Sequence, residues 1–267
     1  MKIPVLLPNI FNYPFTYETD LKLKTGDYVQ VPFGKNKKIG VVWDYFQNDL
    51  NKKIKIKKII KKINIKSLNK KTINFLNWFS KYNLVPVGMS LKLHLLNSEA
   101  VENLTDKEYL NFELANSTKK FKLTDEQLNA LNSLNKNINK FRVHLLQGTT
   151  GSGKTIVYFE TIKKILEKKK QTLILLPEIG LTKEFEKKFL EFFGFKPAVW
   201  HSGVTKKQKK IIWSGLNSGK IKVVIGARSS LFLPFNKLGI IIVDEEHDQS
   251  YKQDEGIIYN ARDMAIS

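Results

Sequence analysis

Residues 148–155 of the chain are Gly148-Thr149-Thr150-Gly151-Ser152-Gly153-Lys154-Thr155. They fill every fixed position of the phosphate-binding pattern G-x-x-x-x-G-K-[ST]. In this pattern the glycines let backbone N–H groups surround phosphate oxygens, and the following helix adds its positive N-terminal end. We predict that these residues bind a nucleoside triphosphate, with Lys154 on the β- and γ-phosphates and Thr155 on Mg²⁺. The structural alternative, a glycine-rich turn before a helix, leaves the Lys-Thr pair unexplained.

The sequence around this loop alternates between strand-like and helix-like segments. Apolar residues at 143–146 predict a strand before the loop, and residues 156–170 predict a helix after it. Further apolar strands are predicted at 172–176, 199–200, 222–225 and 239–243, with helical stretches between them. This spacing predicts an α/β fold with a parallel, doubly wound sheet that is buried on both faces.

A group of acidic residues follows the last of these predicted strands. Residues 244–247 are Asp244, Glu245, Glu246 and His247. Ligands of open α/β sheets bind at the carboxyl ends of the strands, where this group lies. We therefore predict that Asp244 holds the Mg²⁺, directly or through water, and that Glu245 orients the attacking water. The alternative is a solvated acidic loop.

Composition limits the classes of protein to which the chain can belong. The chain has 267 residues and no cysteine, which excludes disulfides and thiolate metal sites within it. No apolar run approaches the roughly 20 residues of a membrane-spanning helix. The apolar start is broken by Pro4 and Pro8, which argues against a signal peptide. We expect a cytoplasmic protein with no membrane partner.

The positive charge is concentrated in the first third of the chain. The formal net charge is +20, and residues 1–98 hold 18 lysines against 5 acidic residues. Such an excess predicts a polyanionic partner, either a nucleic acid or a membrane surface. The alternative is mutational bias, because an AT-rich coding sequence also enriches lysine over a solvated surface.

Three regions are predicted along the chain. Residues 1–98 form a small basic α/β domain, with strands at 4–7, 28–32 and 39–43, a hairpin around residues 34–36, and a helix at 72–82. The alternating Ile and Lys of residues 52–66 predict a lysine-faced strand or an irregular helix, and period two favours the strand. Residues 99–120 are a polar linker or a short helical connection, and residues 121–267 form the nucleotide-binding region.

Several motifs resemble one known family in the same order along the chain. They are FNY at 11–13, VQVPFGK at 29–35, LPEIGLT at 176–182, HSG at 201–203, GARSSLF at 226–232, DEEHDQSYKQ at 244–253 and YNARD at 259–263. Together they resemble the bacterial replication-restart helicases of superfamily 2, over nearly the whole chain. The resemblance implies a RecA-like first helicase lobe at 121–267. It also implies an ATP-dependent 3′→5′ DNA helicase that recognises stalled or branched forks.

The resemblance also implies roles for individual residues. Gln127 matches the glutamine that reads adenine, although Thr124 and Gln127 also form a helix capping box. A group of residues matches positions that contact one DNA strand: Pro177, Thr182, Arg228, Ser229 and Tyr251. For Arg228 the alternative is a surface salt bridge. His247 matches the residue that couples the nucleotide site to DNA or to the second lobe; its alternative is a packing role at the strand end.

For the first region the family implies a pocket for the 3′ end of a nascent strand. The matching residues are Phe11, Asn12, Gly34 and Lys57, and a core aromatic is the alternative for Phe11. Asn12 stands where the family has an aspartate, so we expect a weaker hydrogen bond from the terminal 3′-hydroxyl. In the loop at 250–259, Ile257 stands where an aromatic residue is expected.

The chain also departs from the family pattern. The 99–120 linker is too short for the family's winged-helix domain, and the resemblance places the family's zinc sites after residue 267. Only the first lobe is present, so we expect weak ATP binding, little hydrolysis and no unwinding by this chain. Single-strand DNA-binding protein and other primosome proteins are implied partners. The alternatives are a truncated non-motor protein that binds DNA ends or forks, and a P-loop ATPase that acts on something other than DNA.

Overall fold

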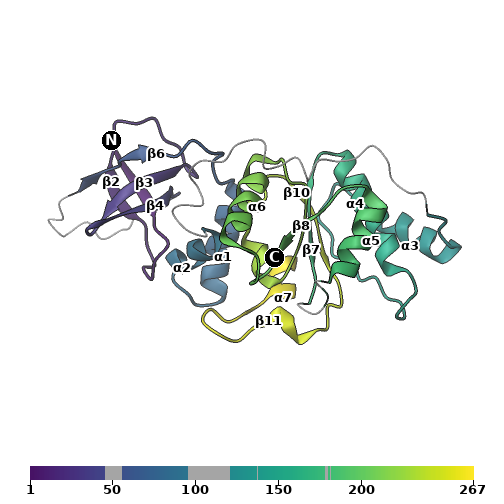
Figure 1. Ribbon diagram of the computed structural model, residues 1–267. Coiled ribbons are helices and arrows are strands. Elements are labelled where there is room, and N and C mark those ends of the chain that lie inside the picture. The colour runs from purple at the N-terminus through teal and green to yellow at the C-terminus, as the bar shows by residue number, and fades with distance from the viewer. Residues whose placement is uncertain (46–55, 96–120, 137, 178–179, 181) are drawn as a thin grey trace.

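A computed structural model describes residues 1–45, 56–95, 121–136, 138–177, 180 and 182–267 (Figure 1). Its N-terminal part holds a six-stranded sheet in the order β5-β2-β1-β4-β3-β6. The strands are β1 (Lys2–Leu6), β2 (Phe15–Glu18), β3 (Tyr28–Phe33), β4 (Asn36–Val42), β5 (Lys57–Lys58) and β6 (Lys61–Lys62). The β3–β4 pair is antiparallel and turns at Gly34, whose φ of +62° suits glycine. The predicted hairpin is confirmed.

The lysine-rich stretch forms strands where it is described. Residues 57–58 pair with β2 and residues 61–62 pair with β3, so the strand prediction holds there over the helical one. The part of the stretch at 52–55 lies outside the described residues, as does the predicted linker at 99–120.

Two helices pack beside this sheet. Helix α1 (Lys70–Tyr82) confirms the helix predicted at 72–82 and begins two residues earlier, because Asn69 caps it through the Thr72 N–H. Helix α2 (Val87–His94) was not predicted, and it follows α1 after a short turn.

The C-terminal part is built on a four-stranded parallel sheet in the order β10-β7-β9-β8. The strands are β7 (Gln171–Leu175), β8 (Ala198–Trp200), β9 (Val223–Gly226) and β10 (Leu238–Val243). Helices α4 (Lys154–Glu167) and α5 (Lys183–Phe193) pack on one face, against Ile174, Val223 and Ile225. Helix α6 (Lys206–Ser218) and the N-terminal part cover the other face (Figure 1). The predicted parallel sheet, covered on both faces, is therefore present.

One predicted strand does not form. Residues 143–146 have no regular secondary structure, and Val143 and Leu145 are 60% and 79% exposed. A strand needs a hydrogen-bonded neighbour, and within the described residues β10 ends the sheet with β7 as its one partner. The apolar pattern at 143–146 was therefore not sufficient to make a strand.

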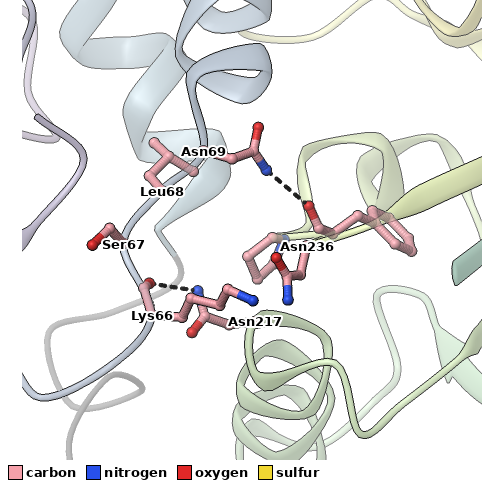
Figure 2. A pocket seen from close by; sticks show the side chains of 8 residues that line it. Lys66, Ser67, Leu68, Asn69, Asn217 and Asn236 are labelled. Carbon is pink, nitrogen blue, oxygen red and sulfur yellow. Dashed lines mark hydrogen bonds between the residues drawn. The ribbon is translucent and has the colours of Figure 1, made fainter. Parts of the chain in front are cut away.

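The N-terminal part packs directly on the C-terminal part. One continuous apolar core contains Leu6 and Leu91 from the first and Leu173 and Leu216 from the second. Figure 2 shows two side-chain hydrogen bonds at the margin of this contact. Asn69 Nδ2 donates to the Phe235 carbonyl at 3.1 Å, and Asn217 Nδ2 donates to the Lys66 carbonyl at 3.0 Å.

The remaining elements are short. Helix α3 (Asp125–Asn135) precedes the phosphate-binding loop. The 3-10 helix η4 (Arg228–Phe232) follows β9, and η5 (Gln249–Tyr251), β11 (Lys252–Gln253), β12 (Tyr259–Asn260) and α7 (Ala261–Ile266) follow β10. In the described parts of the chain, the helices lack the length and apolar character that crossing a membrane requires.

Candidate nucleotide site and DNA interface

The phosphate-binding loop ends in an open helix N-terminus. Gly151 and Gly153 have φ of +83° and +81°, in the left-handed region that favours glycine. Helix α4 begins at Lys154, and no side chain caps its first turn. Its N–H groups are therefore oriented to receive an anion. Lys154 Nζ lies back over the loop and donates to the Gly148 carbonyl at 2.7 Å.

Gln127 links helix α3 to this loop. Its amide oxygen accepts from Thr124 N–H at 3.0 Å, and its backbone N–H donates to Thr124 Oγ1, so the capping box is confirmed. Gln127 Nε2 donates to the Ser152 carbonyl at 3.0 Å. The φ of +81° explains a glycine at 153, and a Cβ there would lie 2.4 Å from that nitrogen. The side chain thus braces the loop, and its contact with adenine stays a prediction.

Tyr158 brings the loop and the acidic group together. Its hydroxyl donates to Asp244 Oδ2 at 2.9 Å, and the Thr155 side chain lies close to it. Burial, helped by the negative charge of Asp244, raises the pKa of Tyr158, so the phenol stays protonated and remains a donor. The two residues predicted to bind Mg²⁺, Thr155 and Asp244, therefore flank one hydroxyl.

These oxygen atoms suit Mg²⁺. The described residues hold no cluster of three or more His, Cys, Asp or Glu side chains that could bind a metal by themselves. Magnesium commonly takes only one or two protein ligands and completes its shell with phosphate oxygens and water. A hydroxyl and a carboxylate beside a phosphate-binding loop match that donor set.

Glu245 has a left-handed backbone conformation and an exposed side chain. Its φ of +48° is unusual for a residue with a side chain and stores on the order of 1–3 kcal/mol of strain. Its side chain is 54% exposed, and its carboxylate lies 3.7 Å from Nε2 of His247. The His247 side chain is 75% exposed, so it does not fill the packing role that was its alternative.

The loop after the acidic group is held from two sides. The Tyr251 hydroxyl shares its one proton between the carbonyl oxygens of Leu175 and Asp244, at the carboxyl ends of β7 and β10. Nη1 of Arg228 donates to the carbonyls of Ser250 and Lys252 at 2.9 and 2.8 Å. Tyr251 is 1% exposed, so its ring lies in the core in this structure. A stacking contact of Tyr251 with DNA stays a prediction that requires this loop to rearrange.

The other residues predicted to contact the tracked strand lie near the same sheet edge. Ser229 Oγ accepts from the Trp200 indole at 3.2 Å. Pro177 is buried directly after β7, and Thr182 caps α5 by accepting from the Phe185 N–H. Residues 178, 179 and 181 between them lie outside the described residues.

The four residues predicted to form the end pocket are connected in space. Lys57 Nζ donates to the Gly34 carbonyl at 3.3 Å. The Phe11 ring, 36% exposed, contacts Phe15, which in turn contacts Phe33 beside Gly34. A series of ring contacts therefore links Phe11 to the turn whose carbonyl Lys57 contacts.

Asn12 and Phe11 also attach this pocket to helix α2. Asn12 Oδ1 accepts from the Val87 N–H at 3.0 Å, and the Phe11 carbonyl accepts from the Gly88 N–H at 3.1 Å. The Asn12 oxygen thus serves as a cap for α2, whose own N-cap, Pro86, has no side-chain donor or acceptor.

Comparison with known proteins yields two domain matches. Residues 3–95 match the model of the PriA 3′ DNA-binding domain, and residues 120–265 match the family described as type III restriction enzyme, res subunit. Replication restart protein PriA of Rickettsia conorii is 44% identical over an alignment that covers 98% of this chain and 40% of the relative. This chain belongs to the PriA family.

Other PriA proteins agree with this assignment. Replication restart protein PriA of Rickettsia prowazekii is 44% identical over 98% of this chain and 40% of its own length. The PriA of Bacillus subtilis is 42% identical over 56% of this chain and 19% of its own length. The chain thus spans about 40% of the Rickettsia PriA proteins that it matches.

Two residues of the nucleotide site and the domain contact were missed by sequence reasoning. Tyr158 lies four residues after Lys154, one helical turn along α4, so its position was a usable signal for a residue facing the nucleotide site. His94 is fully buried between the two parts of the chain, and its partners are remote in sequence. No local pattern indicated it.

Proposed function

We propose that this chain is the nucleotide-binding and DNA-end-binding part of an ATP-dependent 3′→5′ DNA helicase that acts at stalled or branched replication forks. In this proposal residues 1–98 bind the DNA end and residues 121–267 form the first RecA-like lobe. The observation that carries it is the hydrogen bond from Tyr158 to Asp244, which joins the helix that follows the phosphate-binding loop to the acidic group.

Each residue of the nucleotide site has a task in this proposal. Lys154 and the first-turn N–H groups of α4 bind the phosphates. Thr155 and Asp244 hold Mg²⁺, which when bound neutralises charge on the phosphates. Glu245 orients the attacking water, and Gln127 keeps the loop in shape and approaches the adenine.

The path from nucleotide to DNA runs through the loop that follows the acidic group. The backbone of Asp244 accepts a hydrogen bond from Tyr251, and the neighbouring carbonyls of that loop accept from Arg228. In the proposal a conformational change at Asp244 is transmitted to Arg228 and Ser229. These two residues contact the tracked DNA strand together with Pro177 and Thr182. His247, exposed beside Glu245, completes the coupling to DNA or to a second lobe.

The proposed partners are DNA forks, 3′ ends and single strands. They are supported by the match of residues 3–95 to a 3′ DNA-binding domain and by the lysine excess of the same region. Single-strand DNA-binding protein and other primosome proteins are proposed partners on family grounds alone.

Binding of a fluorescent ATP analogue in the presence of Mg²⁺ tests the nucleotide site. Lys154→Ala removes the ammonium group that lies over the loop, and we expect at least about a tenfold loss of affinity. Lys164→Ala is the matched control, because Lys164 is an exposed lysine on the same helix. Equal affinities of Lys154→Ala and the parent chain would refute the assigned site.

A further inference from the structure

Helix α2 connects two sites that the proposed function uses. At its N-terminal end the Val87 and Gly88 N–H groups donate to Asn12 and Phe11 of the end pocket. At its C-terminal end His94 Nδ1 lies 2.8 Å from the carbonyl oxygen of Phe232. Eight helical residues span roughly 12 Å, so one rigid element covers the distance between these contacts.

The pocket end of α2 is closely fitted. A Cβ built on Gly88 would lie 2.6 Å from the Asn9 carbonyl oxygen and 2.8 Å from that of Leu7. Both atoms belong to the backbone, which cannot move aside as a flexible side chain does. A side chain at position 88 would therefore push the segment that carries Phe11 and Asn12 away from the helix.

The other end is held by a buried histidine whose polar atoms are all engaged. His94 is 1% exposed, and its Nε2 lies 2.9 Å from the Tyr28 hydroxyl. A carbonyl can only accept, so Nδ1 carries the proton and donates to Phe232, and Nε2 accepts from Tyr28. The backbone carbonyl of His94 accepts from the Trp213 indole at 2.9 Å. The ring therefore has one tautomer and one orientation.

Phe232 is the last residue of η4, and Arg228 and Ser229 are its first two. Five residues of 3-10 helix span roughly 10 Å. The Phe232 ring is 2% exposed and packs edge-on against Phe79 of α1 at 5.0 Å. Two short rigid elements, α2 and η4, joined by the His94–Phe232 hydrogen bond, therefore connect the end pocket to the strand-contacting residues.

We propose that α2 is a strut that sets the distance between the DNA-end pocket and the strand-contacting element η4, with His94 as the positioning residue that joins them. The ligand that fits is branched DNA whose 3′ end lies at one preferred spacing from the strand on the helicase lobe. This inference rests on the proposed function, because it needs both DNA sites to bind the same molecule.

Fluorescence anisotropy with labelled forks tests the strut. In each fork a different number of unpaired nucleotides, the gap, separates the 3′-hydroxyl end from the branch point. The protein used is the 267-residue chain. We expect the parent to favour one gap length over the others by about tenfold. His94→Phe keeps an aromatic ring but loses both side-chain hydrogen bonds, and we expect the preference to fall to about twofold or less, with affinity for single-stranded DNA unchanged.

Three further variants separate spacing from general stability. Tyr28→Phe leaves Nε2 of His94 without its donor but keeps the bond to Phe232, so the preference should persist. His94→Asn places an amide N–H near the position of Nδ1 and should restore part of it. Gly88→Ala displaces the pocket end and should weaken it as His94→Phe does. If His94→Phe loses its native circular dichroism, the Gly88→Ala and His94→Asn results decide the question.

The outcomes distinguish this inference from the proposed function. A parent chain that prefers 3′-hydroxyl over 3′-phosphate ends but ignores gap length overturns the strut and leaves the end pocket intact. A parent that binds no fork overturns both. Two outcomes would overturn the role of the His94–Phe232 bond. One is a gap preference in His94→Phe equal to that of the parent, and the other is a loss of the preference in Tyr28→Phe as large as that in His94→Phe.

Discussion

The buried position of His94 makes the stability of this chain depend on pH. Burial lowers the pKa of His94 from its ordinary 6.5 to about 4, against a smaller raising effect of the hydrogen bond to Phe232. Between pH 6.5 and 4 the unfolded chain therefore binds a proton at this residue that the folded chain does not. The stabilisation is fully present above pH 6.5 and is lost as the pH falls toward 4.

The size of the effect follows from the same two values. The difference of about 2.5 pKa units corresponds to about 3 kcal/mol at 1.36 kcal/mol per unit. That is a large fraction of the 5–15 kcal/mol by which domains are typically stable. Protonation would also remove the acceptor that Nε2 offers to Tyr28, whereas the bond from Nδ1 to the Phe232 carbonyl would remain.

Urea unfolding at several pH values between 7.5 and 4.5 measures this dependence. The parent should lose about 2 kcal/mol of unfolding free energy over this range, and His94→Phe should show a much smaller slope. Asp27 does not contribute to the pH dependence of the unfolding free energy over this range. Burial opposes its ionisation, but hydrogen bonds from Lys62 and Ser67 lower its pKa, so its contribution is lost only below the acid end of the range. A flat parent profile, or an unchanged slope in His94→Phe, would contradict the assignment.

Two further predictions concern the two ligand sites. Tyr158→Phe removes the hydrogen bond to Asp244 but keeps the ring, so ATP-analogue affinity should fall about three- to tenfold with Mg²⁺ and stay unchanged without it; an equal fall in both conditions would point to a misfolded loop instead. Asn12→Asp supplies an anionic acceptor, so the preference for 3′-hydroxyl over 3′-phosphate ends should rise several-fold, and Asn12→Ala should abolish it. Competition binding with matched forks measures this preference. Identical preferences in both variants would show that Asn12 does not recognise the 3′ end.

Much of the fold could be predicted because its signals are local. The glycine pattern at 148–155 requires a left-handed backbone at Gly151 and Gly153, and the structure has it. The β3–β4 hairpin follows from alternating apolar residues around Gly34. The parallel strands of the second sheet follow from short apolar runs between helical segments. In each case neighbouring residues carry the information.

Other features depended on contacts between remote segments. The pattern at 143–146 was apolar enough for a strand, but pairing decides whether a strand forms, and that segment has no ladder in the described residues. Tyr251 resembled a DNA-stacking residue, yet its ring is buried and its hydroxyl bonds to Leu175, 76 positions earlier.

The amino-acid sequence by itself determined the phosphate-binding loop, the acidic group and the basic first region, since glycine conformation, side-chain charge and apolar periodicity act over a few residues. Only the tertiary structure decided that Tyr158 joins α4 to Asp244 and that His94 joins α2 to η4. Those contacts link residues 86 and 138 positions apart. Packing of the whole chain, which no local pattern encodes, brings such residues together.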